Sequence, residues 1–109
     1  MLEPLLESPV KEKILLFLLM NKDSYPRDIA RNFGVNFTTV LYQLKKMEAA
    51  GVLYSQLRGK VRLYGLDPRY PFRKELEALL RKAFDFLSQA DKDTYYIRRR
   101  RPRLSGKPL

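Results

Sequence analysis

The stretch that decides the fold runs from Gly34 to Met47 and reads GVNFTTVLYQLKKM. Gly34 predicts the end of a short helix, because glycine adopts the left-handed conformation without strain. Asn36 predicts the N-terminal cap of a second helix. Within this second helix the apolar residues recur at helical spacing and form one inward stripe, namely Phe37, Val40, Leu41, Leu44 and Met47. The stretch therefore predicts two helices joined by a tight turn.

The opposite side of this second helix, which ends near Gly51, carries hydrogen-bonding and positively charged groups. Its members are Thr38, Thr39, Tyr42, Gln43, Lys45, Lys46 and Ala49. None of them is a carboxylate, and this favours a surface that meets a polyanion. The alternative, for this helix taken alone, is an ordinary solvated helix face.

The flanking segments extend the pattern on both sides. Ser8-Pro9 predicts the start of a helix that runs to about residue 21, and Pro26 to Phe33 predicts the short helix before the turn. After the second helix, residues 52–57 and 61–66 are β-prone and predict a hairpin. The cations at its tip are Arg58, Lys60 and Arg62. The predicted fold class is therefore mainly α with a small β-hairpin (α+β).

A further helix is predicted at about residues 72–89, after a linker with two prolines. The helix that begins at Pro9 is apolar on more than one face, because residues 14–20 include no polar side chain. We expect a homodimer formed through these first and last helices. The alternative is that the N-terminal leucines or the last helix of the same chain cover the second face.

The net charge of +10 points to a polyanionic partner, most often nucleic acid. Residues 1–90 and residues 91–109 each carry a net charge of +5, so the short C-terminal segment is as cationic as the rest of the chain. We expect residues 91–109 to form a basic, disordered tail.

The chain has no cysteine and no histidine, which removes the commonest metal ligands and the usual general base. We therefore expect no enzyme, no metal site and no cofactor. The N-terminus lacks a signal-peptide pattern, and the longest apolar run, residues 14–20, is far short of the roughly 20 residues that cross a membrane. We expect a cytoplasmic protein without a membrane partner.

The run from Gly34 to Leu53 resembles the recognition-helix signature of the ArsR/MarR-like transcriptional regulators of bacteria and archaea. The resemblance lies in the cap after Gly34-Val35, in the Leu-Lys-Lys-Met-Glu series, and in the glycine and two aliphatic residues that open the wing. Gly59 matches the wing glycine. The resemblance implies a winged helix-turn-helix DNA-binding domain.

Two departures limit what this resemblance implies. Members that sense metals use cysteine and histidine, so metal sensing is not carried over. Leu41 and Tyr42 stand where serine and arginine are common, so the base preference is not carried over either. We divide the chain into a DNA-binding domain (1–67), a linker with a dimerisation or packing helix (68–90) and the basic tail (91–109).

A helix that lies in the major groove presents its early side chains to base edges. The candidate base contacts are Thr38, Thr39, Tyr42 and Gln43, of which Gln43 has the amide needed to read adenine bidentately. The candidate phosphate contacts are Arg27, Lys45, Lys46, Arg58, Lys60 and Arg62. Asn36 caps a helix N-terminus that we expect to face a phosphate.

These observations predict a dimeric transcriptional regulator that binds duplex DNA with sequence specificity and has no catalytic activity. Two other interpretations of the sequence stay open. One is a winged-helix protein-interaction module or an antitoxin-like partner-binding protein. The other is RNA binding, in which Tyr95 and Tyr96 would stack on bases.

Overall fold

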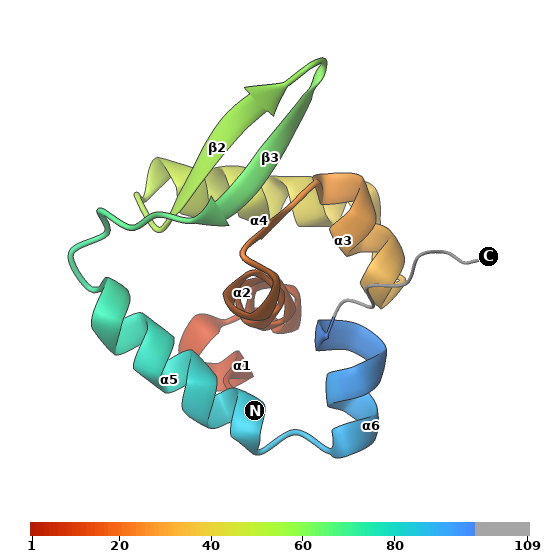
Figure 1. Ribbon diagram of the computed structural model, residues 1–109, viewed down its shortest axis with the longest axis vertical. Coiled ribbons are helices and arrows are strands. Elements are labelled where there is room, and N and C mark those ends of the chain that lie inside the picture. The colour runs from red at the N-terminus through yellow and green to blue at the C-terminus, as the bar shows by residue number, and fades with distance from the viewer. Residues whose placement is uncertain (98–109) are drawn as a thin grey trace, which may run out of the picture.

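The computed structural model describes residues 1–97, and the predictions made for residues 98–109 lie outside them. The elements in chain order are α1 (Glu3–Leu6), α2 (Pro9–Asn21), β1 (Asp23–Ser24), α3 (Pro26–Phe33), α4 (Phe37–Ala49), β2 (Leu53–Arg58), β3 (Val61–Leu66), α5 (Arg73–Asp85), α6 (Gln89–Asp91) and the π-helical turn η1 (Lys92–Tyr96). Figure 1 shows α2 end-on at the centre of the other helices. The predicted winged helix-turn-helix of class α+β, with an extra C-terminal helix, is confirmed.

The turn between α3 and α4 forms as the sequence predicts. Gly34 ends α3 with a φ of 65°, and its N–H donates to carbonyl groups of the last turn of α3. Asn36 begins α4, and its side-chain oxygen accepts hydrogen bonds from the backbone N–H groups of Thr38 at 2.8 Å and Thr39 at 3.2 Å. Both helix ends are therefore satisfied locally, which fixes the connection between the two helices.

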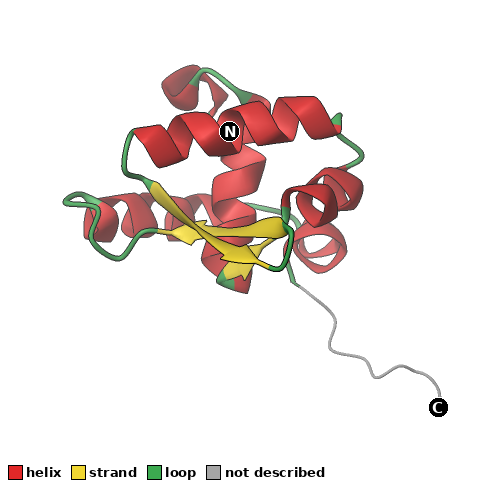
Figure 2. Cartoon of the chain, turned by 90° about the horizontal axis from the view of Figure 1, so that it is seen from above, coloured by secondary structure: helices red, strands yellow, loops and turns green. Residues whose placement is uncertain are grey.

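The strands β2 and β3 form the predicted hairpin, with Gly59 at its tip. The sequence did not predict β1, a two-residue strand that pairs with the other edge of β3 and gives the order β1-β3-β2 (Figure 2). Gly65 permits this close approach, because a Cβ atom there would lie 2.9 Å from the carbonyl oxygen of Lys22 and 2.8 Å from the hydroxyl oxygen of Tyr54. The strand β1 thus ties the end of α2 to the hairpin.

The far half of the hairpin extends beyond the core, and this explains why the sequence shows no clear alternation there. At the base, Leu53 pairs with Leu66, and the side chain of Leu53 is buried. At the tip, Arg58 pairs with Val61, and residues 56–62 are exposed on both faces. The hairpin therefore projects as a wing (Figure 1).

The helix α2 is enclosed by its own chain. Its residues from Ile14 to Leu18 are all buried. The helices α4 and α5 pack against it, and α1, α3 and η1 contact it as well. The intrachain alternative for the second face of this helix is therefore confirmed, and α2 keeps little apolar surface for a second subunit. None of the described helices is long and apolar enough to cross a membrane.

The C-terminal part of the described chain differs from the prediction. The helix α5 ends at Asp85, and Ser88 caps a new helix by accepting a hydrogen bond from the N–H of Asp91 at 3.1 Å. Residues 91–97, which we assigned to a disordered tail, instead continue as helix into η1, and Tyr96 is buried. The predicted tail boundary at residue 91 is therefore wrong, because this segment has aromatic side chains that join the core.

We call residues 88–97 the C-terminal clasp, and aromatic rings hold it in place. The ring centroid of Tyr96 lies 5.4 Å from that of Phe33 and 6.0 Å from that of Phe84. Tyr95 stacks on Phe33 at 5.7 Å. Burial raises the pKa of Tyr96 to about 12. The clasp thereby links the end of α5 to α3, the first helix of the helix-turn-helix.

The raised pKa of Tyr96 predicts a loss of stability at high pH. A tyrosine in the unfolded chain titrates near pH 10, so the contribution of neutral Tyr96 is complete below that pH and is lost as the pH approaches about 12. Between about pH 9 and pH 12 the unfolding free energy of the wild type should fall by roughly 1–3 kcal/mol more than that of Tyr96→Phe. Urea unfolding at each pH measures this difference.

The variant Tyr95→Phe is the matched control, because it removes a neighbouring hydroxyl and keeps Tyr96. Its pH dependence should follow that of the wild type. If Tyr96→Phe also lost stability as steeply as the wild type, the buried phenol would not be the source of the effect.

Candidate nucleic-acid interface

The exposed side of α4 carries most of the side chains that we predicted to contact bases. Thr38, Thr39 and Tyr42 are exposed, as are Lys45 and Lys46. The Lys46 ammonium lies 5.8 Å from the ring centroid of Tyr42, so a cation and a phenol stand together. No exposed residue of α4 is a carboxylate. This side of α4 therefore combines hydrogen-bonding groups with positive charge.

Asn36 is exposed at the start of α4, but its side-chain oxygen is occupied by the N–H groups of Thr38 and Thr39. These two N–H groups are therefore not free to bind a phosphate, although the amide nitrogen of Asn36 keeps its ability to donate. The observed role of Asn36 is that of the helix cap that starts α4.

Gln43 lies at the border between the exposed side of α4 and the core. Its neighbours one turn away, Val40 and Met47, are both buried. Gln43 is half-buried, and its side-chain oxygen Oε1 is enclosed without a hydrogen-bond partner among the described residues. Bidentate reading of adenine needs both Oε1 and Nε2 at the surface. In the observed side-chain position Gln43 does not present both atoms.

The three wing cations differ in how they are held. The Nη1 atom of Arg62 donates to the hydroxyl of Ser55 at 3.0 Å, and that hydroxyl donates to Oε2 of Glu48 at 2.6 Å. Arg62 is thus connected to α4 through β2, a link that no local sequence pattern indicates. Arg58 and Lys60 are exposed at the tip, and no side chain among residues 1–97 forms an ion pair with them.

A groove lies between the start of α3, the side of α4 and the strand β3, with a volume of about 320 Å³. Its wall includes Arg27, Lys45 and Arg62, which are predicted phosphate contacts from three separate elements. The Arg27 guanidinium carbon lies 4.4 Å from the ring centroid of Phe37, which holds it at the groove. The sequence predicted these cations singly, but only the folded chain shows that they share one concave surface.

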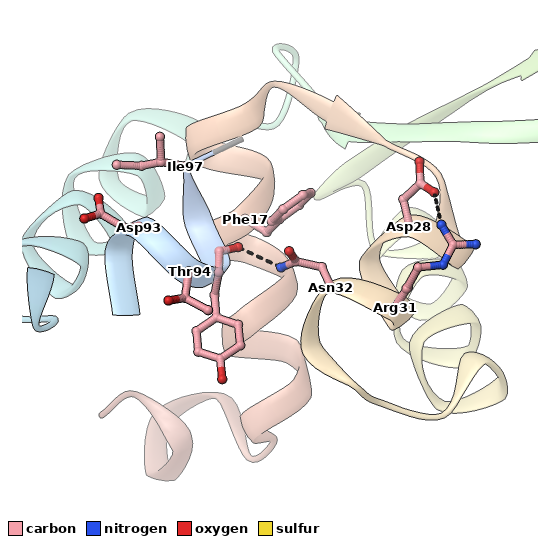
Figure 3. A pocket seen from close by; sticks show the side chains of 8 residues that line it. Phe17, Asp28, Arg31, Asn32, Asp93, Thr94 and Ile97 are labelled. Atoms are coloured by element: carbon pink, nitrogen blue, oxygen red, sulfur yellow. Dashed lines mark hydrogen bonds and ion pairs between the residues drawn. The ribbon is translucent and has the colours of Figure 1, made fainter. Parts of the chain in front are cut away.

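A second hollow, of about 430 Å³, lies where the C-terminal clasp meets α3 (Figure 3). Asp28 and Arg31 form an ion pair across its α3 side at 3.4 Å. Asn32 donates from Nδ2 to the carbonyl of Tyr95 at 2.7 Å. Ile97 lines the same hollow, so the last of the described residues lies beside α3.

Among residues 1–97, the second hollow is lined by two carboxylates, those of Asp28 and Asp93, and by the single cation of Arg31. This described part of its lining lacks the excess of positive charge that nucleic-acid phosphates require. Within residues 1–97, no three carboxylate, thiol or imidazole groups come together as a metal site would need. The candidate interface is the exposed side of α4 with the groove and the wing.

Comparison with known proteins finds a family profile that matches part of the chain, and similar chains among the solved structures. Residues 8–55 match the sequence profile described as "Bacterial regulatory protein, arsR family". No curated protein sequence matches the chain. Among solved structures, Lactococcus lactis ZitR, as the C30AH42A mutant in its apo form, is similar with a TM-score of 0.49 and 14% sequence identity. The alignment covers 84% of this chain and 78% of that chain.

Proposed function

We propose that the chain is a transcriptional regulator that binds duplex DNA as a homodimer with sequence preference. The proposal starts from residues 8–55, which match the arsR-family profile and form the helix-turn-helix. The observation that carries this proposal is the exposed side of α4, which has hydroxyl, phenol and ammonium groups and no carboxylate. The wing adds three exposed cations on the same domain. Such a surface is typical of a groove reader with flanking phosphate contacts.

In the proposed complex, α4 lies in the major groove, whose width of roughly 12 Å admits a helix. Thr38, Thr39 and Tyr42 then face base edges from the first turns of α4. Gln43 joins them only if its side chain turns outward from the position in which Oε1 is enclosed. The cations that would contact phosphates are Arg27, Lys45, Lys46, Arg58, Lys60 and Arg62. Asn36 holds the N-terminus of α4 as its cap.

The charge reversal Lys46→Glu with Arg58→Glu tests DNA binding. Both side chains are exposed, so the double variant should fold as the wild type does. Its affinity for duplex DNA should fall at least about tenfold, and the slope of log affinity against log salt should decrease by roughly 2, because each phosphate contact contributes about 0.9. Fluorescence anisotropy with a labelled duplex over a range of salt concentrations measures both quantities.

The control variant is Lys74→Glu with Arg81→Glu, which makes the same charge change at two exposed positions of α5. It should reduce binding less than the α4 and wing variant does. Equal losses in the two variants would mean that only overall charge matters. Wild-type protein that shows no salt-dependent duplex binding, but purifies with a stoichiometric protein, would favour the protein-interaction module instead.

A dimer is supported by α5 rather than by α2. Phe72 precedes α5, Leu79 lies within it and Phe86 follows it, spaced at seven residues, so they lie close to one line along the helix. They are 62%, 38% and 73% exposed. An exposed apolar stripe of this kind is a candidate contact surface for a second copy of the chain. To read two successive half-sites, the two α4 helices of such a dimer would have to lie about 34–36 Å apart.

The double variant Leu79→Glu, Phe86→Glu should dissociate the dimer, because two charges would be buried at the contact. Sedimentation velocity should show a dimer for the wild type at about tens of micromolar, and a monomer for this variant. The control Leu57→Glu with Val61→Glu introduces the same charges at exposed apolar positions of the wing and should stay dimeric. A monomeric wild type would remove the dimer from the proposal.

The arginine-rich segment, residues 98–109, lies outside the described residues, and its sequence has six cations and no acidic side chain. We expect a chain that ends at Ile97 to select the same consensus from random duplex DNA as the full chain, because the reading side chains are kept. Its affinity should fall for all sequences alike, with the salt slope lower by about 0.9 for each lost phosphate contact. A consensus lost on truncation would place specificity in the tail.

A further inference from the structure

We propose that Tyr42 reads the C5-methyl group of a pyrimidine in the major groove, so that the chain prefers thymine or 5-methylcytosine to a pyrimidine without this methyl. The inference rests on the proposed function, because Tyr42 meets base edges only when α4 lies in the groove. The group that is recognised is a single methyl. Thymine always carries it, and cytosine gains it by enzymatic methylation.

Tyr42 lies at the centre of the exposed side of α4. Thr38 precedes it by one turn and Lys46 follows it by one turn, and both are exposed. Tyr42 itself is 60% exposed. Phe37, the other aromatic residue of α4, is half-buried and contacts Arg27. Tyr42 is therefore the ring that α4 presents where the first turns of a recognition helix face base edges.

The remaining side chains of α4 match the polar base edges poorly. Guanine is read by arginine or lysine, adenine by an exposed amide and cytosine by a carboxylate. Residues 37–49 include no arginine. Their one amide, Gln43, has Oε1 enclosed, and their one carboxylate, Glu48, accepts the hydroxyl of Ser55. The thymine methyl is the apolar group among the base edges of the major groove, and an aromatic ring is a suitable contact for it.

The lysines and threonines of α4 are less suited than Tyr42 to select a base. Lys45 and Lys46 lie in the third turn of α4, behind the early residues that meet base edges, and are placed for phosphates. The hydroxyls of Thr38 and Thr39 bond to several bases and discriminate little between them. The methyl groups of these two threonines are the rival contacts for a pyrimidine methyl.

The ring of Tyr42 is held in place from within α4. The Lys46 ammonium lies 5.8 Å from the ring centroid, which is a cation–π distance. A side chain that is already held loses little entropy when it binds, and this favours a contact as small as one methyl. The Tyr42 hydroxyl offers a rival role, because it is able to donate to a phosphate oxygen. That role needs no methyl on the base.

The test uses the full chain and the duplex that it binds most tightly in a selection from random DNA. Each thymine of this duplex is replaced in turn by deoxyuridine, which removes one methyl and keeps the charge and every hydrogen-bonding group. At the position that Tyr42 reads, the wild type should bind the deoxyuridine duplex about fourfold more weakly, because burial of one group of this size contributes about that factor. Competition anisotropy at constant salt measures the ratio of the two affinities.

Variants of exposed residues assign the contact. Tyr42→Phe keeps the ring and should keep the affinity ratio, whereas Tyr42→Ala should bring it close to one. The matched controls Thr38→Ser and Thr39→Ser remove a methyl, keep the hydroxyl and should keep the ratio. A ratio that survives Tyr42→Ala, or that is lost in a threonine variant, would overturn the assignment to Tyr42. A ratio of one in the wild type, with weaker binding of every duplex by Tyr42→Phe, would identify the phosphate contact instead.

Cytosine methylation gives an independent measurement at the same position. A cytosine–guanine pair placed there should be bound about fourfold more tightly when the cytosine carries the C5-methyl, by the wild type and by Tyr42→Phe but not by Tyr42→Ala. A wild type that binds duplex DNA and is indifferent to both methyl exchanges would overturn this inference alone. A chain that binds no duplex would remove the proposed function and the inference with it.

Discussion

The enclosure of α2 is the constraint on which the described structure depends. Five consecutive apolar residues, Ile14 to Leu18, cover more than one side of this helix, and each is buried. Burial of such side chains stabilises a fold by about 1.5–3 kcal/mol each, so every side of α2 has to be covered. The helix α4 covers one of these sides with its inward stripe. The orientation of the outward side of α4 is therefore set by the core.

The candidate interface contains cations of two kinds. Arg27 and Arg62 are held against the folded chain, one over an aromatic ring and the other on a serine hydroxyl that is itself bonded to α4. Arg58 and Lys60 are exposed at the wing tip, without an ion pair among residues 1–97. Held side chains lose little entropy on binding and favour one geometry, whereas exposed ones adapt to different backbone positions. The groove is thus the more selective part of this surface, and the wing tip the more adaptable.

Local patterns predicted the elements that are stabilised locally. Gly34 and Asn36 act through bonds to residues within a turn, so their roles could be predicted from the sequence. Gln43 depends on which of its neighbours is buried, and β1 exists only because β3 lies beside it. The predicted start of the tail at residue 91 was wrong, because the contact of Tyr95 with Phe33 exists only in the folded chain. The pattern of α2 predicted two covered faces, but it could not tell whether the cover came from the same chain.

The C-terminal clasp also has a consequence for the order in which the chain folds during synthesis. Asn21 donates to the carbonyl of Tyr96 at 2.7 Å, across 75 positions of sequence, and Asn32 reaches Tyr95 across 63. A ribosome delivers the helix-turn-helix long before the residues that complete its core. Until the clasp emerges, the face of Phe33 that stacks on Tyr95 and the side of α2 that η1 contacts stay exposed. The nascent chain therefore exposes apolar surface until Tyr95 and Tyr96 have been synthesised and can pack on it.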